Sequence, residues 1–413
     1  MKSSANKTLV VIGGGAAGFF CAINAAQLHP ALRVVILEKS SKLLSKVKIS
    51  GGGRCNVTHQ CSSIAQMIKY YPRGANFLKK AFQYFFVPDT IAWFQQRAVP
   101  LVAEADGRMF PKANTSEAIV QCFLQEANRL GVEIKMNCDV QQIISSQTKT
   151  PAFELVLSNG KKISTDYLCV ACGGFPKASQ FNWLLSTGHT IVPPVPSLFT
   201  FNIPNTAITQ LMGLSVPEAG IKISGTKLQQ QGPLLITHWG FSGPAVLKLS
   251  ALAAIELAAM QYQFQVLVNW LPQYHEAAMI EKLKALRFEL AAQKMVNRNP
   301  FGLPARLWEY LLTESGINLD IRWADVPAKE QNKLAKLLCA QEFSVKGKTT
   351  FKEEFVTAGG ISLSEVNAQT MESKMIPGLF FAGEILNIDA VTGGFNFQNA
   401  WTTGMIAARH MKP

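Results

Sequence analysis

The stretch Thr8-Leu-Val-Val-Ile-Gly13-Gly-Gly15-Ala-Ala-Gly18, near the start of the chain, determines the expected fold. Its β-branched residues 8–12 predict a short strand, and the apolar residues 16–27 predict a helix directly after the glycines. A second predicted strand, residues 33–37, ends at Glu38, twenty residues after the last glycine. This order of strand, Gly-x-Gly-x-x-Gly, helix, strand and acid predicts a Rossmann-type dinucleotide-binding unit.

Each position in this unit has a separate role in binding a dinucleotide. Gly13 allows a tight turn, Gly15 lets a pyrophosphate approach the backbone, and Gly18 lets the helix pack closely on the strand. The free N–H groups of the helix N-terminus favour phosphate. Glu38 can accept hydrogen bonds from a ribose diol and would repel a 2′-phosphate, so NADP is disfavoured as the resident nucleotide. NAD and FAD are not distinguished by these residues.

Composition limits the class of protein. The 413 residues suggest two or three domains, and 48% hydrophobic residues suffice for a large core. Residues 8–32 carry no charged side chain, but they divide into strand and helix, so we expect a buried unit and no membrane span. No signal-peptide pattern is visible, and the eight cysteines show no pattern of paired C-x-x-C motifs. We therefore expect reduced cysteines and a cytoplasmic protein.

The net charge of +13 indicates a polyanionic partner, nucleic acid first and acidic lipid second, or a basic surface with no partner. The predicted helices of residues 275–340 carry many cations, and Trp308, Tyr310 and Trp323 lie among them. Such a segment could grip phosphates and stack bases, or it could be a cap whose lysines are solvated. Its cations include Lys282, Lys284, Arg287, Lys294, Arg298 and Arg306.

Two further glycine-rich stretches favour a flavin. Ser50-Gly-Gly-Gly-Arg-Cys-Asn56 follows the first unit and is flanked by lysines, so it reads as backbone along a cofactor or as a flexible loop. Near the C-terminus, a predicted strand ends in Ala382-Gly-Glu384, and Thr392-Gly-Gly-Phe-Asn-Phe-Gln398 opens a last helix. The N-terminus of that helix can direct N–H groups at the flavin N1/O2 edge. FAD is therefore favoured over NAD, and the histidines show no metal-ligand spacing.

These motifs, with Thr237-His-Trp-Gly-Phe-Ser-Gly-Pro244 and Thr370-Met-Glu-Ser-Lys374, resemble the BaiN/RdsA (YhiN-like) family of FAD-dependent oxidoreductases over essentially the whole chain. The resemblance implies an α/β fold in which a discontinuous Rossmann-type FAD-binding domain, residues 1–193 and 355–413, carries two insertions. These are a β-rich, barrel-like domain (194–268 and 341–354) and a small basic helical domain (269–340).

The resemblance and the motifs together give a set of positions expected to line FAD. They are Gly13, Gly15, Ala16, Ala17, Gly18, Glu38, Lys39, Lys46, Ser50, Gly51, Gly53, Arg54, Asn56, Val140, Ala171, Gly173, Gly383, Glu384, Asp389, Gly394, Phe395, Asn396 and Phe397. Two departures from the family pattern occur. Residues 175–181 replace a glycine- and serine-rich stretch, and Asn387 stands where the family has an aspartate, so Asp389 alone is carried over.

The family implies more than one activity: reduction of a uridine of 23S ribosomal RNA to dihydrouridine, oxidation of an aminoketone, and reduction of steroid-like enones. The +13 charge favours RNA. A small-molecule oxidase or reductase, and a flavin redox partner without its own turnover, are the alternatives. Cys55 and His238 are candidate general acids, because cations near Cys55 could lower its pKa and His238 could face the flavin. No second Gly-x-Gly-x-x-Gly is visible, so NAD(P)H is expected only as a transient reductant.

Overall fold

The computed structural model describes residues 7–146, 151–349 and 356–411, and the predicted boundary at 354/355 lies outside them. The chain forms two compact units. The first comprises Met1–Ser197 and Lys352–Pro413, and the second comprises Leu198–Phe351. Residues from both ends of the chain therefore share one unit, and the second unit is inserted into it.

The first unit is built on a five-stranded sheet in the order β20-β10-β1-β2-β6, with every pair parallel. Nearly all residues of its three central strands are buried, as expected for a parallel sheet covered on both faces. The predicted strand–helix–strand order at the N-terminus is confirmed. The strands are β1 (Thr8–Ile12), β2 (Arg33–Leu37), β6 (Glu133–Lys135), β10 (Tyr167–Val170) and β20 (Leu379–Phe381).

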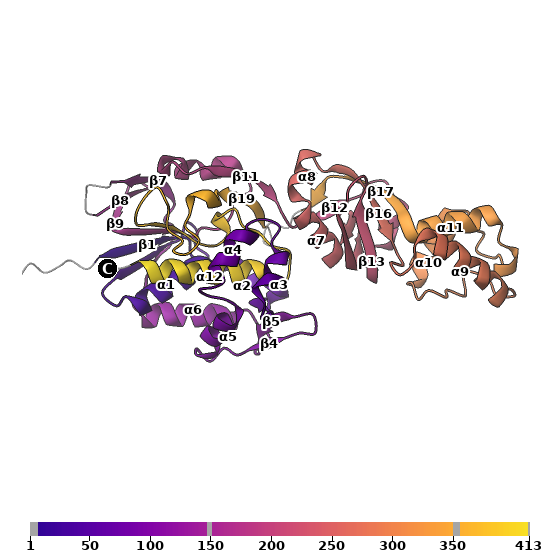
Figure 1. The fold of residues 1–413 in the computed structure, drawn as a ribbon, viewed down its shortest axis with the longest axis horizontal. Helices are drawn as coiled ribbons and strands as arrows, with labels where there is room; N and C mark the ends of the chain where they lie inside the picture. The colour runs from indigo at the N-terminus through magenta and orange to yellow at the C-terminus, as the bar shows by residue number, and fades with distance from the viewer. Residues whose placement is uncertain (1–6, 147–150, 350–355, 412–413) are drawn as a thin grey trace, which may run out of the picture. The chain divides into compact units, whose positions relative to one another are not determined.

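Helices α1 (Ala16–Leu28) and α12 (Phe395–His410) lie against each other and form the core of this unit (Figure 1). Every residue of α1 from 17 to 26 is buried, because the helix is apolar on all sides and is enclosed. The ring of Phe20 lies 4.7 Å from that of Trp93 and 5.2 Å from that of Trp401. The last helix of the chain thus completes the core that the first helix begins.

Shorter elements surround this core. Two three-stranded sheets, β3-β5-β4 and β7-β8-β9, and one two-stranded sheet, β11-β19, belong to the first unit. The elements are α2 (Ser45–Gly53), β3 (Thr58–His59), α3 (Ile64–Met67), η1 (Ile68–Tyr70), α4 (Ala75–Ala81), α5 (Val87–Gln95), β4 (Leu101–Ala103), β5 (Arg108–Pro111), α6 (Glu117–Arg129), β7 (Val140–Ser145), β8 (Phe153–Leu157), β9 (Lys162–Thr165), η2 (Ala178–Thr187), β11 (Ile191–Pro196), β19 (Thr357–Ile361), η5 (Leu363–Glu365) and η6 (Gly383–Ile385).

The second unit contains a seven-stranded antiparallel sheet in the order β17-β16-β13-β14-β15-β12-β18, together with its helices. One continuous hydrophobic core joins the sheet to the helices. The division of this unit into a β-rich and a helical domain stays a prediction. Its elements are β12 (Thr200–Asn202), η3 (Ala207–Leu211), β13 (Ser215–Ile223), β14 (Gln229–Thr237), β15 (Gly240–Ser242), α7 (Pro244–Leu252), α8 (Ala254–Ala259), β16 (Gln263–Asn269), α9 (Glu276–Glu289), α10 (Ala305–Ser315), η4 (Trp323–Asp325), α11 (Ala328–Ala340), β17 (Gln341–Lys346) and β18 (Lys348–Thr349).

A search of the described ranges finds no helix that combines the length and the hydropathy needed to span a bilayer. All eight cysteines are free thiols, and the sulfur atoms of Cys21 and Cys169 lie 3.7 Å apart in the core.

Candidate dinucleotide site

The three glycines of the first turn have the surroundings that their predicted roles require. A methyl group on Gly18 would lie 1.9 Å from the carbonyl oxygen of Gly13, so only glycine allows this contact between helix and strand. Gly13 has φ +115° and lies against the backbone of Ala171 and Cys172. A methyl group on Gly15 would meet no atom within 4 Å. Open space therefore lies beside the N-terminus of α1, where a pyrophosphate would bind.

Glu38 is fixed beside this turn by hydrogen bonds. Its Oε2 accepts from the N–H of Gly14 at 2.9 Å, and its Oε1 accepts from the N–H and the hydroxyl of Ser40, both at 2.8 Å. Oε2 has accepted one bond only and can accept another, so Glu38 can still bind a ribose hydroxyl. The N–H of Cys138 donates to the carbonyl of Glu38 at 2.9 Å, which brings the start of β7, and with it Val140, near the same strand end.

The second glycine cluster lies next to the first. The N–H of Leu44 donates to the carbonyl of Gly14 at 2.9 Å, and α2 follows directly. The helix is kinked at residues 50–52, where Gly51 and Gly52 have left-handed conformations. Methyl groups on Gly52 and Gly53 would meet no atom within 4 Å, so this backbone can also be approached closely by a ligand.

Arg54 and Asn56, at the end of this cluster, contact other parts of the protein. The Arg54 guanidinium lies over the ring of Phe110 and pairs with Glu104 at 2.7 Å. In the amide orientation that satisfies both of its neighbours, the Asn56 side chain donates to the carbonyl of Thr58 at 2.9 Å and accepts from the N–H of Gly394 at 3.0 Å. Asn56 therefore joins the second glycine cluster to the start of α12.

The surroundings of Cys55 raise the pKa of its thiol, whereas the cations near it in sequence suggested a lowered pKa. The thiol is fully buried, and burial raises its pKa to about 12, with only a partial opposing effect from its hydrogen bond to Ser50. The prediction of a lowered thiol pKa is wrong, because Arg54 is engaged by Glu104 and burial outweighs nearby charge. The thiol stays protonated at neutral pH.

The carboxyl ends of β10 and β20 meet at the same edge of the sheet. The Glu384 carboxylate pairs with Lys46 at 2.8 Å and accepts from the N–H of Thr357 at 2.9 Å. A methyl group on Gly174 would lie 3.1 Å from Glu384 and 2.8 Å from Thr357. The hydroxyl of Thr357 is buried and has no hydrogen-bond partner among the described residues, so it is available to a bound group.

The other positions near these strand ends that were predicted to line FAD contact neighbouring parts of the first unit. Gly383 has φ +78°, and a methyl group there would lie 2.7 Å from the Cβ of Ala17. The N–H of Ala171 donates to the carbonyl of Ile12 at 2.8 Å. Lys39 lies over the ring of Phe175, at 5.2 Å. Ala16 opens α1, and Gly173 has φ +79°, close to Glu384.

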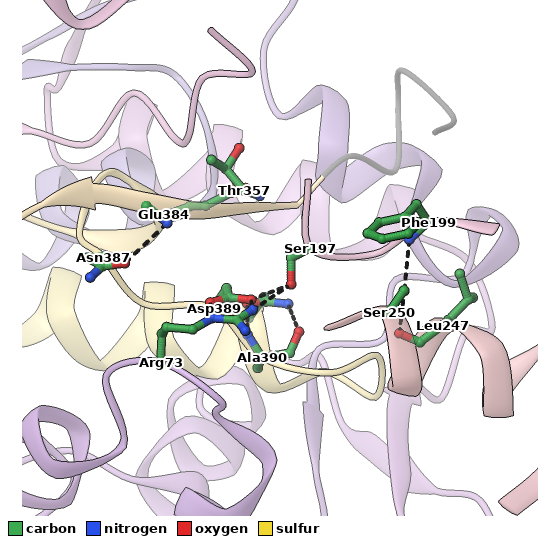
Figure 2. A network of polar contacts seen from close by, with 12 residues as sticks. Arg73, Ser197, Phe199, Leu247, Ser250, Thr357, Glu384, Asn387, Asp389 and Ala390 are labelled. Carbon is green, nitrogen blue, oxygen red and sulfur yellow. Dashed lines mark hydrogen bonds and ion pairs between the residues drawn. The ribbon is translucent and has the colours of Figure 1, made fainter. Parts of the chain in front are cut away.

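Asp389 is enclosed by a network that the sequence did not reveal (Figure 2). Its carboxylate is fully buried, accepts from Nε of Arg73 at 2.6 Å, and accepts further bonds from a second Arg73 nitrogen and from the Ser197 hydroxyl. Burial raises the pKa of Asp389, while Arg73 and Ser197 oppose that rise. The carboxylate is thus engaged by protein groups, and any contact with a cofactor would come from its backbone. Asn387 accepts instead from the N–H of Gly359 at 3.1 Å.

The start of α12 is held by close backbone packing. Gly394 has φ +90°, and a methyl group there would lie 2.5 Å from the carbonyl oxygen of Thr58. The Phe395 carbonyl accepts from the Tyr71 hydroxyl at 2.6 Å, and its ring stacks on Tyr70 with centroids 4.3 Å apart. No acidic side chain lies in the first turn of the helix, which leaves its N-terminus suited to negative charge.

Two residues of this turn that were predicted to line FAD have side chains that contact other protein groups. The Asn396 side chain accepts from the N–H of Ala390 at 3.0 Å and donates to its carbonyl at 3.1 Å. Phe397 stacks on Trp401 with centroids 5.5 Å apart. Further along the helix, the side-chain oxygen of Asn399 is buried without a partner in the described part of the chain.

His238 lies in the second unit, in the turn between β14 and β15, and is exposed with its ring edge-on to Trp239. Base stacking by Trp308 and Trp323, one of the two interpretations of residues 275–340, is contradicted by the structure. Trp308 and Trp323 are buried and stack on each other in the core, so they cannot contact a base. In the ranges that the structure covers, no group of three or more His, Cys, Asp or Glu side chains could hold a metal ion.

Comparison with known proteins gives the family. Residues 7–410 match the model described as "HI0933-like protein Rossmann domain", so the chain belongs to this family. The chain is 28% identical to a ribosomal RNA dihydrouridine synthase of Haemophilus influenzae and 27% identical to one of Escherichia coli. It is 25% identical to a 3-dehydro-bile acid delta(4,6)-reductase of Clostridium scindens. Each match covers 97% of both chains.

Solved structures share the fold. A 3-ketosteroid-delta4-(5alpha)-dehydrogenase of Rhodococcus jostii has a TM-score of 0.51 at 13% identity, covering 99% of this chain and 98% of the other. A 3-ketosteroid delta1-dehydrogenase of Sterolibacterium denitrificans has a TM-score of 0.52 at 12% identity, covering 98% and 99%. The predicted α/β Rossmann fold and the family resemblance are confirmed. The chain is an oxidoreductase of the flavin type.

Proposed function

We propose that this HI0933-like protein is an FAD-dependent oxidoreductase that reduces a uridine of 23S ribosomal RNA to dihydrouridine. Two relatives that carry the name ribosomal RNA dihydrouridine synthase match it over 97% of both chains, which supports the substrate class. The observation that carries the cofactor assignment is the open space above Gly15, with Glu38 at the adjacent strand end.

The residues of the first unit would share the work of holding FAD. The N–H groups at the start of α1 bind the pyrophosphate, and Glu38 accepts from the ribose hydroxyls. The N-terminus of α12, at Gly394 and Phe395, directs N–H groups at the flavin edge where negative charge collects on reduction. When bound and reduced by two electrons from its donor, the flavin would supply a hydride to the conjugated C=C bond of the uracil ring. The protein must then supply a proton to the other carbon.

Cys55 and His238 are the candidate proton donors. Cys55 keeps its proton at neutral pH because its pKa is about 12, and it lies in the loop that we assign to FAD. His238 is exposed in the second unit, in the turn between β14 and β15. If either is the acid, its alanine variant should bind FAD normally and lose product formation. Unchanged turnover in that variant would exclude the residue.

The reductant is proposed to be NAD(P)H, visiting transiently, since the sequence has one glycine fingerprint only. We place the reaction in the cytoplasm, where its RNA substrate is made. Stopped-flow bleaching of the purified flavoprotein by NADH and by NADPH tests the donor directly.

Deletion of the gene in its host tests the proposed function. Dihydrouridine in 23S ribosomal RNA is quantified by mass spectrometry, with and without the purified flavoprotein and a reductant added back. A modified site lost on deletion and restored by the protein supports the proposal. An unchanged dihydrouridine content would overturn it.

Reduction of a small enone is the second candidate function. It is favoured by the relative named as a bile acid reductase, which also matches 97% of both chains. Oxidation of an amine or aminoketone belongs to the same class, and a redox partner without its own turnover is a third possibility. Screening enones for reoxidation of the reduced flavin, and amines for flavin bleaching and peroxide release, would distinguish them from RNA reduction.

A further inference from the structure

The positive charge of the chain is not concentrated in the unit that contains the helical segment of residues 275–340. The second unit, residues 198–351, has 15 Lys and Arg against 11 Asp and Glu, a net charge of +4. The first unit has the other 25 basic and 16 acidic residues, a net charge of +9. Most of the excess charge therefore belongs to the unit with the predicted flavin site.

Within the first unit, one segment accounts for this excess. Residues 39–80 contain nine Lys and Arg and no acidic residue, and the next acid along the chain is Asp89. By contrast, residues 269–340 of the second unit contain ten basic and eight acidic residues. The helical segment is thus nearly balanced in charge, and the segment of residues 39–80 is not.

Three of the nine cations of residues 39–80 form ion pairs within the described part of the protein, and six do not. Lys46, Arg54 and Arg73 pair with Glu384, Glu104 and Asp389. The other six are lysines, all exposed, and none forms an ion pair with another described residue. These six are Lys39, Lys42, Lys48, Lys69, Lys79 and Lys80.

The six lysines fall into two groups along the predicted cofactor. Lys39, Lys42 and Lys48 precede or lie in α2, beside the first glycine turn, where the pyrophosphate of FAD would account for their charge. Lys69 lies in η1, and Lys79 and Lys80 lie in α4, which packs against η1. This second group belongs to elements that contact α12: α4 packs against it, and Tyr70 of η1 stacks on Phe395, its first residue.

An aromatic side chain joins the second group to the predicted flavin end of the site. Tyr70 is 36% exposed, and its ring lies 4.3 Å from that of Phe395 at an interplanar angle of 14°. Its carbonyl accepts from the N–H of Val391 at 3.0 Å, which fixes it beside the loop before α12. Tyr70 and Tyr84 are the large apolar side chains exposed within residues 39–88. A segment whose exposed side chains include cations and tyrosine but no large aliphatic residue fits nucleic acid better than lipid.

We propose that Lys69, Tyr70, Lys79 and Lys80 form an RNA-docking face. The three lysines bind backbone phosphates beside the target nucleotide, and Tyr70 stacks on an unpaired base. This inference rests on the proposed RNA substrate and assigns it a surface on the first unit. The helical segment of residues 269–340 is not the docking surface.

A matched pair of triple variants tests the docking face. One is Lys69→Glu, Lys79→Glu and Lys80→Glu, and the other, on α11, is Lys329→Glu, Lys333→Glu and Lys336→Glu. All six lysines are exposed, and both triples change the net charge equally. The dissociation constant of each flavin-loaded protein for an unmodified 23S ribosomal RNA fragment is measured between about 50 and 200 mM salt, a range over which affinity that depends on phosphate contacts falls steeply.

The docking-face triple should bind the fragment at least about tenfold more weakly and reduce the slope of log K against log salt by about 3. The α11 triple should change the slope by less than about 1. Tyr70→Ala should weaken binding about tenfold, and Tyr70→Phe should keep the affinity. Flavin content and melting temperature of each variant show that the fold is intact.

Equal losses in the two triples, or no loss in the docking-face triple, would overturn the docking face. Preferential binding of wild-type protein to anionic phosphatidylserine vesicles over the RNA fragment would also overturn it. RNA binding through this face without dihydrouridine formation would support the face and overturn the proposed function. Dihydrouridine formation with unaltered RNA affinity in the docking-face triple would support the proposed function and overturn the docking face.

Discussion

The two units of the chain use polar and charged residues differently. In the first unit, Gly15 leaves open space at the N-terminus of α1, and the buried carboxylate of Asp389 pairs with Arg73, which is distant in sequence. Six lysines of residues 39–80 form no ion pair with a described residue. In the second unit, the basic helical residues are nearly matched by acids, and tryptophans fill the core. The number of cations in a segment is therefore a poor guide to binding, because acids and burial decide what remains available.

The largest expected effect is that of Gly18→Ala in the first unit. A methyl group 1.9 Å from the Gly13 carbonyl oxygen cannot be accommodated without moving α1 away from β1, so we expect little folded, flavin-loaded protein. Gly15→Ala is the control, because its methyl group would enter open space. That variant should fold and melt normally yet hold flavin weakly, as measured by absorbance and thermal melting. Normal flavin content in Gly18→Ala would contradict the assigned packing role.

Asp389→Ala should have the next largest effect. It leaves Arg73, whose side chain is 15% exposed, without its buried carboxylate, at a cost of about 3–5 kcal/mol in the free energy of unfolding. Ser197→Ala removes one hydroxyl and should cost about 1 kcal/mol. Chemical denaturation of both variants measures the difference. Equal costs would show that the Arg73–Asp389 pair is not the centre of the network.

This network also marks the limit of what the sequence could predict. The first glycine turn was predictable because strand, glycines, helix and acid are consecutive and each position has a local reason. Arg73 and Ser197 lie 316 and 192 residues from Asp389 along the chain, and no local pattern connects them. Only the folded chain brings them together, so their role was missed.

Burial explains the other errors. The cations adjacent to Cys55 in sequence suggested a lowered pKa, but the thiol is enclosed and its pKa rises instead. Trp308 and Trp323 lie among basic residues in sequence, yet they face the core of the second unit. Sequence adjacency to charge does not reveal the direction in which a side chain points.

A smaller, pH-dependent effect is expected at Glu126 in the first unit. Hydrogen bonding to Arg129, with the Arg97 guanidinium nearby, holds the pKa of this carboxyl below its usual range. Its stabilising effect should be present above the ordinary glutamate pKa and lost as the pH falls through the lower, folded-state value. Glu126→Gln should therefore cost about 1 kcal/mol at pH 7. Melting at pH 7 and near pH 3 measures this, and an equal difference at both would contradict it.

The smallest effect is expected in the second unit, at the surface pair of Lys294 and Asp320. Both side chains are exposed, 49% and 83%, so solvent screens the pair despite its 2.7 Å distance. Asp320→Asn should leave the melting temperature and the pH dependence of stability unchanged. A clear loss of stability in this variant would show that the second unit depends on its charges as the first unit does.

The central claim is that the first unit holds both the flavin and the RNA-docking face. The most direct test is the rate of dihydrouridine formation on 23S ribosomal RNA from a deletion strain, measured for wild-type protein and the two triple variants. We predict that the docking-face triple raises KM at least about tenfold with kcat nearly unchanged, because phosphate contacts outside the reacting ring bind substrate and transition state alike. We predict wild-type kinetics for the α11 triple. A raised KM confined to the α11 triple would contradict the claim.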